Sequence, residues 1–282
     1  MNKWLRAQRP MRRVIIATLP CVAGSVYFFG WRCLVIVAVS CAAAFLAELT
    51  FCRRRNEPVS EAVFVTAILY ALSMPASVPW HVLLIGIVFA VVFVKEVFGG
   101  FGRNIFNPAM AGRCFVYICF PVAMTSSWPP VAAGYAGALA KWTTITGMDA
   151  ITGATPMALI KAGTCVPGGS DLFYGFFLGR IGGTMGVTSA LLILVGGLYL
   201  FATKTANRTV IVTLVAVYAA LNQALHMLGI GHVPGTLTAI LSGGFLFGAF
   251  FMATDPVSSP STPVGRAVYA VLIAVFTLVI RS

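Results

Sequence analysis

The sequence predicts an all-α integral membrane protein with about nine to ten transmembrane helices, because composition, segment length and charge placement agree. Of its 282 residues, 59% are hydrophobic and 9% are charged. A soluble domain of this size needs more polar side chains to cover its surface. The apolar residues form stretches of about 17–25, the length that crosses a hydrocarbon core roughly 30 Å thick. Basic residues gather at alternate ends of these stretches, as a membrane topology requires.

The apolar stretches divide into two repeat-like halves on either side of one polar-leaning segment. We expect a first membrane half over 1–124, an extracytoplasmic segment over 125–171 and a second membrane half over 172–282. Each half is expected to contain five spans, with the last span of the second half beyond residue 282, since a five-plus-five repeat is natural for a membrane carrier. The expected spans are 14–30, 32–52, 62–78, 82–98, 108–124, 187–203, 209–228, 236–253 and 265–281. The glycine-rich stretch 172–186 is predicted to be re-entrant or a broken helix.

The basic residues predict the orientation of the chain. The formal net charge is +12, but the basic side chains are scattered among the spans, which argues against a nucleic-acid partner. Basic side chains precede the first span and follow the second, and few fall on the opposite side, so the N-terminus is expected in the cytoplasm. The first group is Lys3, Arg6, Arg9, Arg12, Arg13 and Arg53–Arg55, with Arg103, Lys204, Arg208 and Arg266 expected on the same side; the opposite group is Arg32, Lys141, Lys161, Arg180 and Arg281.

The cysteines and histidines predict no metal site. The seven cysteines include no Cys-x-x-Cys pair, so the chain alone offers no iron–sulfur ligand set. Six of them fall in predicted spans, where cysteine is usually a small core residue. The three histidines are too few and too scattered to argue for haem.

The extracytoplasmic segment contains Asp149-Ala150-Ile151-Thr152-Gly153-Ala154-Thr155-Pro156. Its plain interpretation is a turn, because Gly153 permits unusual backbone angles and Pro156 makes Thr155 extended. The chemical interpretation is that the exposed Thr155 hydroxyl accepts a phosphoryl or nucleotidyl group, with Asp149 steering a metal-bound transfer reaction.

A second cluster occupies the loop after the fourth predicted span, Lys95 to Pro108. The Asn-Pro pair at 107–108 is typical of a turn or a helix start, and the glycines at 99, 100 and 102 allow close backbone approach. The amides of Asn104 and Asn107 could instead pair with the edge of a planar heterocycle. In that case Phe98, Phe101 or Phe106 would stack on its face.

The third cluster ends the eighth predicted span, from Gly243 to Pro256, and its glycines are expected to permit tight helix packing. Asp255 follows an apolar run, where a carboxylate is costly unless it is paired or lines a polar path. The alternative is an Asx-Pro turn in headgroup water. Phe247 and Phe251 are one helical turn apart, which fits either lipid-facing filler or a hydrophobic gate.

Together the three clusters resemble one family, which contains the NqrB component of the sodium-translocating NADH:quinone oxidoreductase (Nqr) and the RnfD component of the Rnf complex. Thr-Gly-Ala-Thr at 152–155 matches the flavinylation motif of that family, in which the last threonine carries FMN as a phosphoester; Ala150 departs from the motif. The strings at 98–109 and 251–257 also match the family, and the resemblance covers essentially the whole chain.

The resemblance implies roles for particular residues. Thr155 would carry FMN, with Asp149, Thr152, Gly153 and Ala154 in the motif recognised by a flavin transferase. Asn104 and Asn107 would lie near a second, noncovalent flavin, which is riboflavin in Nqr. Asp255, Phe247 and Phe251 would lie along the ion path. Val187 replaces an acid of the family pattern, and Ala44-Phe45 replaces the glycine pair associated with quinone in Nqr, so no quinone site is predicted.

The predicted function is a membrane electron-transfer component of an Rnf-type complex that couples redox chemistry to Na+ or H+ translocation. The NqrB component of Nqr is the alternative within the family, and a solute channel or transporter without a redox role is the alternative outside it. The expected partners are a flavoprotein, further membrane proteins of the complex, a flavin transferase and lipid. We expect a multi-pass protein of the bacterial inner membrane that is inactive as a redox translocase by itself.

Overall fold

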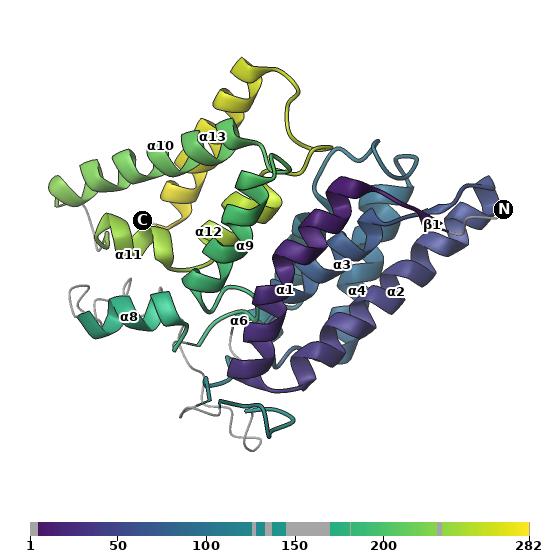
Figure 1. Cartoon of the computed structure of the whole chain (residues 1–282), viewed down its shortest axis with the longest axis horizontal. Coiled ribbons are helices and arrows are strands. Elements are labelled where there is room, and N and C mark those ends of the chain that lie inside the picture. The colour runs from purple at the N-terminus through teal and green to yellow at the C-terminus, as the bar shows by residue number, and fades with distance from the viewer. Residues whose placement is uncertain are drawn as a thin grey trace.

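The computed structural model describes residues 5–125, 128–132, 137–144, 170–180, 182–229 and 233–281, and most of this part of the chain is helical (Figure 1). The first half contains α1 (Arg9–Phe29), α2 (Arg32–Arg55), α3 (Ala62–Leu72), α4 (Trp80–Val91), the π-helical turn η1 (Val92–Glu96), α5 (Pro108–Cys119) and α6 (Pro121–Thr125). The second half contains α8 (Ser170–Leu178), α9 (Ala190–Ala202), α10 (Arg208–Met227), α11 (Thr236–Leu241), α12 (Phe245–Phe247), η2 (Gly248–Met252) and α13 (Pro263–Arg281). Strands β1 (Leu5–Arg6) and β2 (Val59–Ser60) form a short parallel pair.

Among the described residues, the helices α1, α2, α10 and α13 are the four that are long and apolar enough to cross a membrane by length and composition. Local sequence explains where several helices begin and end. Asn107 accepts hydrogen bonds from the first backbone N–H groups of α5, and Asn207 does the same for α10. Gly30 ends α1 with a φ of 98°, where a β-carbon would meet the backbone of Lys141.

The expected span 62–78 is wrong in extent because its helix is shorter than expected, whereas the expected span 187–203 agrees with α9 to within a few residues. Helix α3 ends at Leu72 and α9 begins at Ala190. The non-helical residues beside them pair with each other: Met185 N–H donates to Met74 O at 3.0 Å, and Gly186 N–H donates to Leu72 O at 2.7 Å. This pairing satisfies backbone groups that would be costly to leave unbonded inside a membrane. It also agrees with the expectation of non-helical backbone in the glycine-rich stretch before α9.

The expected continuous span 236–253 is also wrong, because Ser242, Gly243 and Gly244 interrupt it between α11 and α12. Gly243 and Gly244 have φ angles of 62° and 77°, which a right-handed helix does not allow. These two glycines therefore break the helix, a role that differs from the tight helix packing expected of them.

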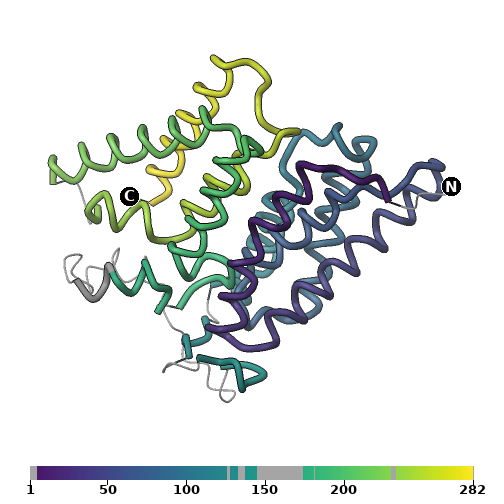
Figure 2. The backbone as a smooth tube through the Cα atoms, in the orientation of Figure 1, coloured from purple at the N-terminus to yellow at the C-terminus, as the bar shows by residue number. Residues whose placement is uncertain are grey.

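The two halves meet along α1 and α9, which pack side by side (Figure 2). In the first half α2 packs against α3 and α4, and in the second half α10 lies along α13. Gly196 and Gly197 of α9 leave room for the rings of Phe251 and Phe250, since a β-carbon would approach them to 3.0 and 2.5 Å. The predicted flavinylation residues, Asp149 and Thr152–Thr155, and also Cys165, lie outside the described residues.

Candidate functional site

Four of the predicted flavin and ion-path residues line one cavity of about 420 Å³. It lies where the loop before α5 approaches the segment after η2. Asn104, Asn107, Phe251 and Asp255 all line it, although the loop and the segment are far apart in sequence. Its other polar lining residues include Arg9, Arg13, Lys95, Lys204, Thr205 and Thr254. The tertiary structure therefore brings together two of the three predicted clusters.

Glycines shape the loop that carries the two asparagines. Gly99, Gly100 and Gly102 have φ angles of 109°, 91° and 91°, a region that other residues rarely adopt. A β-carbon on Gly100 would also lie 3.1 Å from the Arg55 guanidinium. The loop therefore needs glycine both for its backbone angles and for its approach to a charged side chain.

The two asparagines differ in how many of their amide atoms are engaged. Asn107 Oδ1 accepts from the N–H groups of Ala109 and Met110, and its Nδ2 donates to Met252 O at 3.3 Å. Asn107 thus caps α5 and fastens its start to the end of η2. Asn104 is 7% exposed and donates to Phe106 O; its Oδ1 accepts no hydrogen bond from the described residues. Asn104 is the asparagine with an acceptor available to a ligand.

Asp255 lines the cavity and also caps a turn. Its carboxylate accepts from Val257 N–H at 3.2 Å and from the Ser258 hydroxyl at 3.0 Å. Burial raises the pKa of Asp255, and these two hydrogen bonds oppose the rise. Asp255 therefore caps a turn and lines a polar cavity at the same time. The two interpretations of this residue, as a turn cap and as part of an ion path, are compatible in this structure.

Phe247 and Phe251 lie inside the helix bundle, so the lipid-facing interpretation of these residues is wrong. They are 1% and 4% exposed, and their ring centroids are 5.1 Å apart. The pair lies on the chain segment between the break at Gly243–Gly244 and Asp255. Its position fits the predicted hydrophobic gate.

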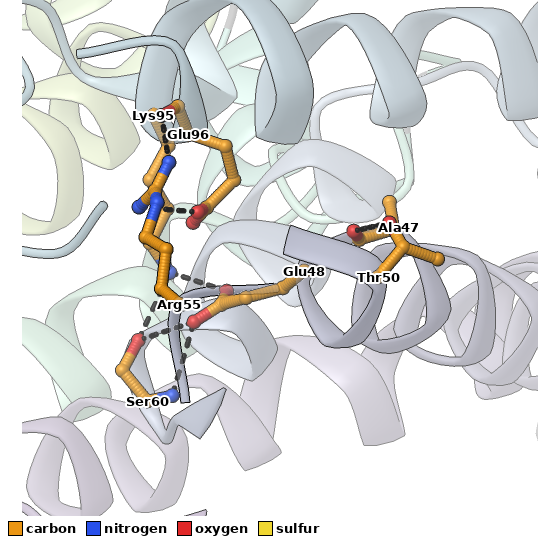
Figure 3. A network of polar contacts seen from close by, with 7 residues as sticks. All are labelled: Ala47, Glu48, Thr50, Arg55, Ser60, Lys95 and Glu96. Carbon is orange, nitrogen blue, oxygen red and sulfur yellow. Dashed lines mark hydrogen bonds and ion pairs between the residues drawn. The ribbon is translucent and has the colours of Figure 1, made fainter. Parts of the chain in front are cut away.

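A buried polar network adjoins the cavity, and the sequence prediction did not include it (Figure 3). Lys95 Nζ lies 2.5 Å from Glu48 Oε2 and donates to Ser60 Oγ at 2.9 Å. Glu48 Oε1 accepts from the backbone N–H and the hydroxyl of Ser60. Glu48 and Lys95 are each 2% exposed. The available signal was a charged residue within each of two predicted spans, because such residues normally pair inside a membrane protein.

A second ion pair lies beside this network. Glu96 Oε2 is 3.1 Å from Arg55 Nη1, and Arg55 also donates to the backbone carbonyl of Glu96. Glu96 is 1% exposed, whereas Arg55 is 31% exposed at the end of α2. Since Lys95 also lines the cavity, charged side chains continue from the cavity wall into the core between α2 and η1.

Comparison with known proteins identifies relatives of the whole chain. A sequence model of the "NQR2, RnfD, RnfE family" matches residues 2–282. The chain is 36% identical to the D subunit of the Na+-translocating ferredoxin:NAD+ oxidoreductase complex of Acetobacterium woodii, over 96% of this chain and 79% of that protein. It is 35% identical to the D subunit of the ion-translocating oxidoreductase complex of Shewanella amazonensis, over 96% and 84%. It is also 35% identical to the B subunit of the Na+-translocating NADH-quinone reductase of Ectopseudomonas mendocina, over 92% of this chain and 61% of that protein.

Proposed function

Because the chain belongs to the NQR2, RnfD, RnfE family, we propose that it is a membrane component of an Rnf-type complex that couples electron transfer to Na+ or H+ translocation. The observation that carries the proposal is the shared cavity, where the predicted flavin residue Asn104 and the predicted ion-path residue Asp255 both form the wall. The NqrB component of Nqr remains the alternative within the family. The other redox and membrane proteins of such a complex are the proposed partners, so the chain alone is not expected to catalyse turnover.

We propose that Thr155 carries FMN through a phosphoester, with Asp149, Thr152, Gly153 and Ala154 in the motif that a flavin transferase recognises. The bound flavin would supply one-electron chemistry, while the protein determines where it lies and which charges surround it. The proposal rests on the residues of the motif and on family membership.

The attachment predicts a mass difference. When an active flavin transferase is coexpressed, intact mass should show the FMN adduct on wild type but not on Thr155→Ala. Thr143→Ala, which alters a threonine outside the motif, is the matched control and should keep the adduct. A wild-type chain without the adduct under these conditions would refute the attachment.

We propose a second, noncovalent flavin such as riboflavin in the cavity. A volume of about 420 Å³ lies within the usual range for small-molecule sites. Asn104 has an acceptor available, and Asn107 would act by holding the loop in place. Acid extraction of the purified complex should release less unattached flavin from Asn104→Ala than from wild type, with the covalent adduct unchanged. Equal release from the two proteins would place the second flavin elsewhere.

A carrier without redox function is the second candidate, and the short helices and the break at Gly243–Gly244 favour it, because interrupted helices are common in carriers. The two functions differ in what drives ion movement. In vesicles containing the complex, ion uptake that requires an electron donor supports the redox function, and equal uptake without a donor supports the carrier.

A further inference from the structure

The guanidinium of Arg281, on the last turn of α13, is surrounded by oxygen atoms from the interrupted helix. It donates to Ala239 O at 2.8 Å, Ser242 O at 2.9 Å and Gly243 O at 2.8 Å. It also donates to the Tyr218 hydroxyl at 3.2 Å and lies 5.8 Å from the centroids of the Tyr218 and Phe245 rings. One cation therefore has four oxygen neighbours, three of them backbone carbonyls.

The break between α11 and α12 is the reason these carbonyls converge. In a continuous helix each carbonyl accepts from the N–H group four residues later. The positive φ angles of Gly243 and Gly244 interrupt that pattern, and carbonyls at the end of α11 turn toward α13. Backbone oxygens inside a membrane protein need a replacement donor. Here the Arg281 guanidinium donates to three of these carbonyls, and the Ser242 hydroxyl also donates to Ala239 O at 3.3 Å.

Among the described residues, dipoles rather than an acid balance the charge at this position. Among the described residues the ion pairs are Arg12–Glu61, Arg55–Glu96 and Lys95–Glu48, and none involves Arg281. A cluster of carbonyl and hydroxyl oxygens without a carboxylate is also the kind of environment that replaces the water around an alkali cation. The oxygens at the break thus suit a free cation as well as the guanidinium.

The position of this cluster along the chain relates it to Asp255. Residues 242–255 pass through α12 and η2, a distance of roughly 15–20 Å at helical rise. Phe247 and Phe251 lie between the two ends. Oxygen ligands therefore occur on both sides of the aromatic pair, with Asp255 at one end and the carbonyls at the other.

The guanidinium also has space into which it can move. A mostly apolar groove of about 1140 Å³ runs between α5 and the interrupted helix, and Arg281, Gly243, Gly244 and Phe245 line it. Gly248 lines the same groove, and a β-carbon there would meet nothing within 4 Å. A rotation of the Arg281 side chain toward this groove would leave the four oxygens without their cation.

We propose that the oxygens of Ala239, Ser242, Gly243 and Tyr218 form a cation site for Na+ or another alkali cation, which Arg281 occupies as a tethered competitor. The free cation binds only when the guanidinium moves into the groove. The place of this site in an ion path rests on the proposed function, but cation binding itself does not. The site lies beyond the aromatic pair from Asp255, so it adds a second binding position to the proposed path.

Neutralising the arginine should expose the site. The test compares wild type, Arg281→Gln and Arg281→Lys within the purified complex, heated without an electron donor in NaCl or in choline chloride of equal concentration. The measurement is the temperature at which half of this chain remains soluble. In Arg281→Gln we expect Na+ to raise that temperature by roughly 2–4 °C relative to choline. Arg281→Lys keeps a tethered cation and should show little Na+-specific shift, as should wild type.

Two further variants separate the site from a general salt effect. Arg266→Gln removes another arginine from the same helix and should produce no Na+-specific shift. Tyr218→Phe removes one oxygen and should reduce the shift when combined with Arg281→Gln. If the complex containing Arg281→Gln can be purified in NaCl but not in choline chloride, that result also supports the site. Equal stability of Arg281→Gln in the two salts, or failure to recover it in both, would overturn the proposal and leave Arg281 as a structural cap. Because no flavin or turnover is measured, this result is independent of the proposed redox function.

Discussion

Asp255 combines a turn-capping geometry with a position on the cavity wall, and the two roles respond differently to loss of charge. Asp255→Asn keeps the size of the side chain and an oxygen that can accept from Val257 N–H. If the carboxylate takes part in ion coupling, the purified complex in vesicles should keep its flavin content and move fewer cations per electron. Glu57→Gln, which neutralises an exposed acid outside the cavity lining, is the matched control. Equal ion uptake per electron in Asp255→Asn and wild type would leave only the cap.

The same residue predicts a pH dependence. Burial raises the pKa of Asp255, so as pH falls the carboxylate takes up a proton at a higher pH than an ordinary aspartate, whose pKa is about 3.9. Ion coupling that needs the charged form is fully present above the raised pKa and is lost as pH decreases through it. In wild type, the number of cations moved per electron should therefore decrease as pH falls. In Asp255→Asn, the remaining ion transport should not show this decrease.

At the scale of elements, the Glu48–Lys95 pair joins α2 to η1, and Ser60 of β2 completes it. Removing one charge leaves the other buried without its partner, which costs about 3–5 kcal/mol of unfolding free energy. We therefore expect Glu48→Gln and Lys95→Met each to lower the melting temperature substantially. The double variant should lose less than the sum of the two, because neither charge then remains unpaired.

A pair at the surface provides the control for this prediction. Arg12 and Glu61 approach to 2.7 Å, but Arg12 is 61% exposed, and solvent weakens such pairs. Glu61→Gln should therefore lower the melting temperature much less than Glu48→Gln. If Glu48→Gln and Glu61→Gln lowered the melting temperature equally, the buried pair would stabilise the fold no more than the exposed pair.

For the whole molecule, the basic residues predict that the segment 125–171 lies outside the cell. A membrane-impermeant maleimide added to intact cells should label wild type but not Cys165→Ser. Cys21, Cys33 and Cys52 are buried. Cys114 and Cys119 are exposed on α5, whose other exposed side chains include Met110, Tyr117 and Ile118; lipid or another protein of the complex is expected to cover them. Labelling that requires opened cells would invert the predicted topology.

Features that depend on local chemistry could be predicted from the amino-acid sequence without the structure. Apolar stretches mark α1, α2, α10 and α13, since the length needed to cross a membrane is a property of one segment. The Asn-Pro pair marked the start of α5, and the glycines before it marked a loop that needs unusual backbone angles. The motif strings also identified the family, because they preserve residue order.

Features that depend on a distant partner became clear only from the way the helices pack. Helix α3 ends at Leu72 because the backbone beyond it pairs with residues 184–186. The break at Gly243–Gly244 is supported by Arg281 of another helix, and Glu48 lies within reach of Lys95 only after α2 and η1 pack. The physical reason is common to all three. A buried backbone group or charge requires a partner, and hydrophobic periodicity contains no information about which distant residue supplies it.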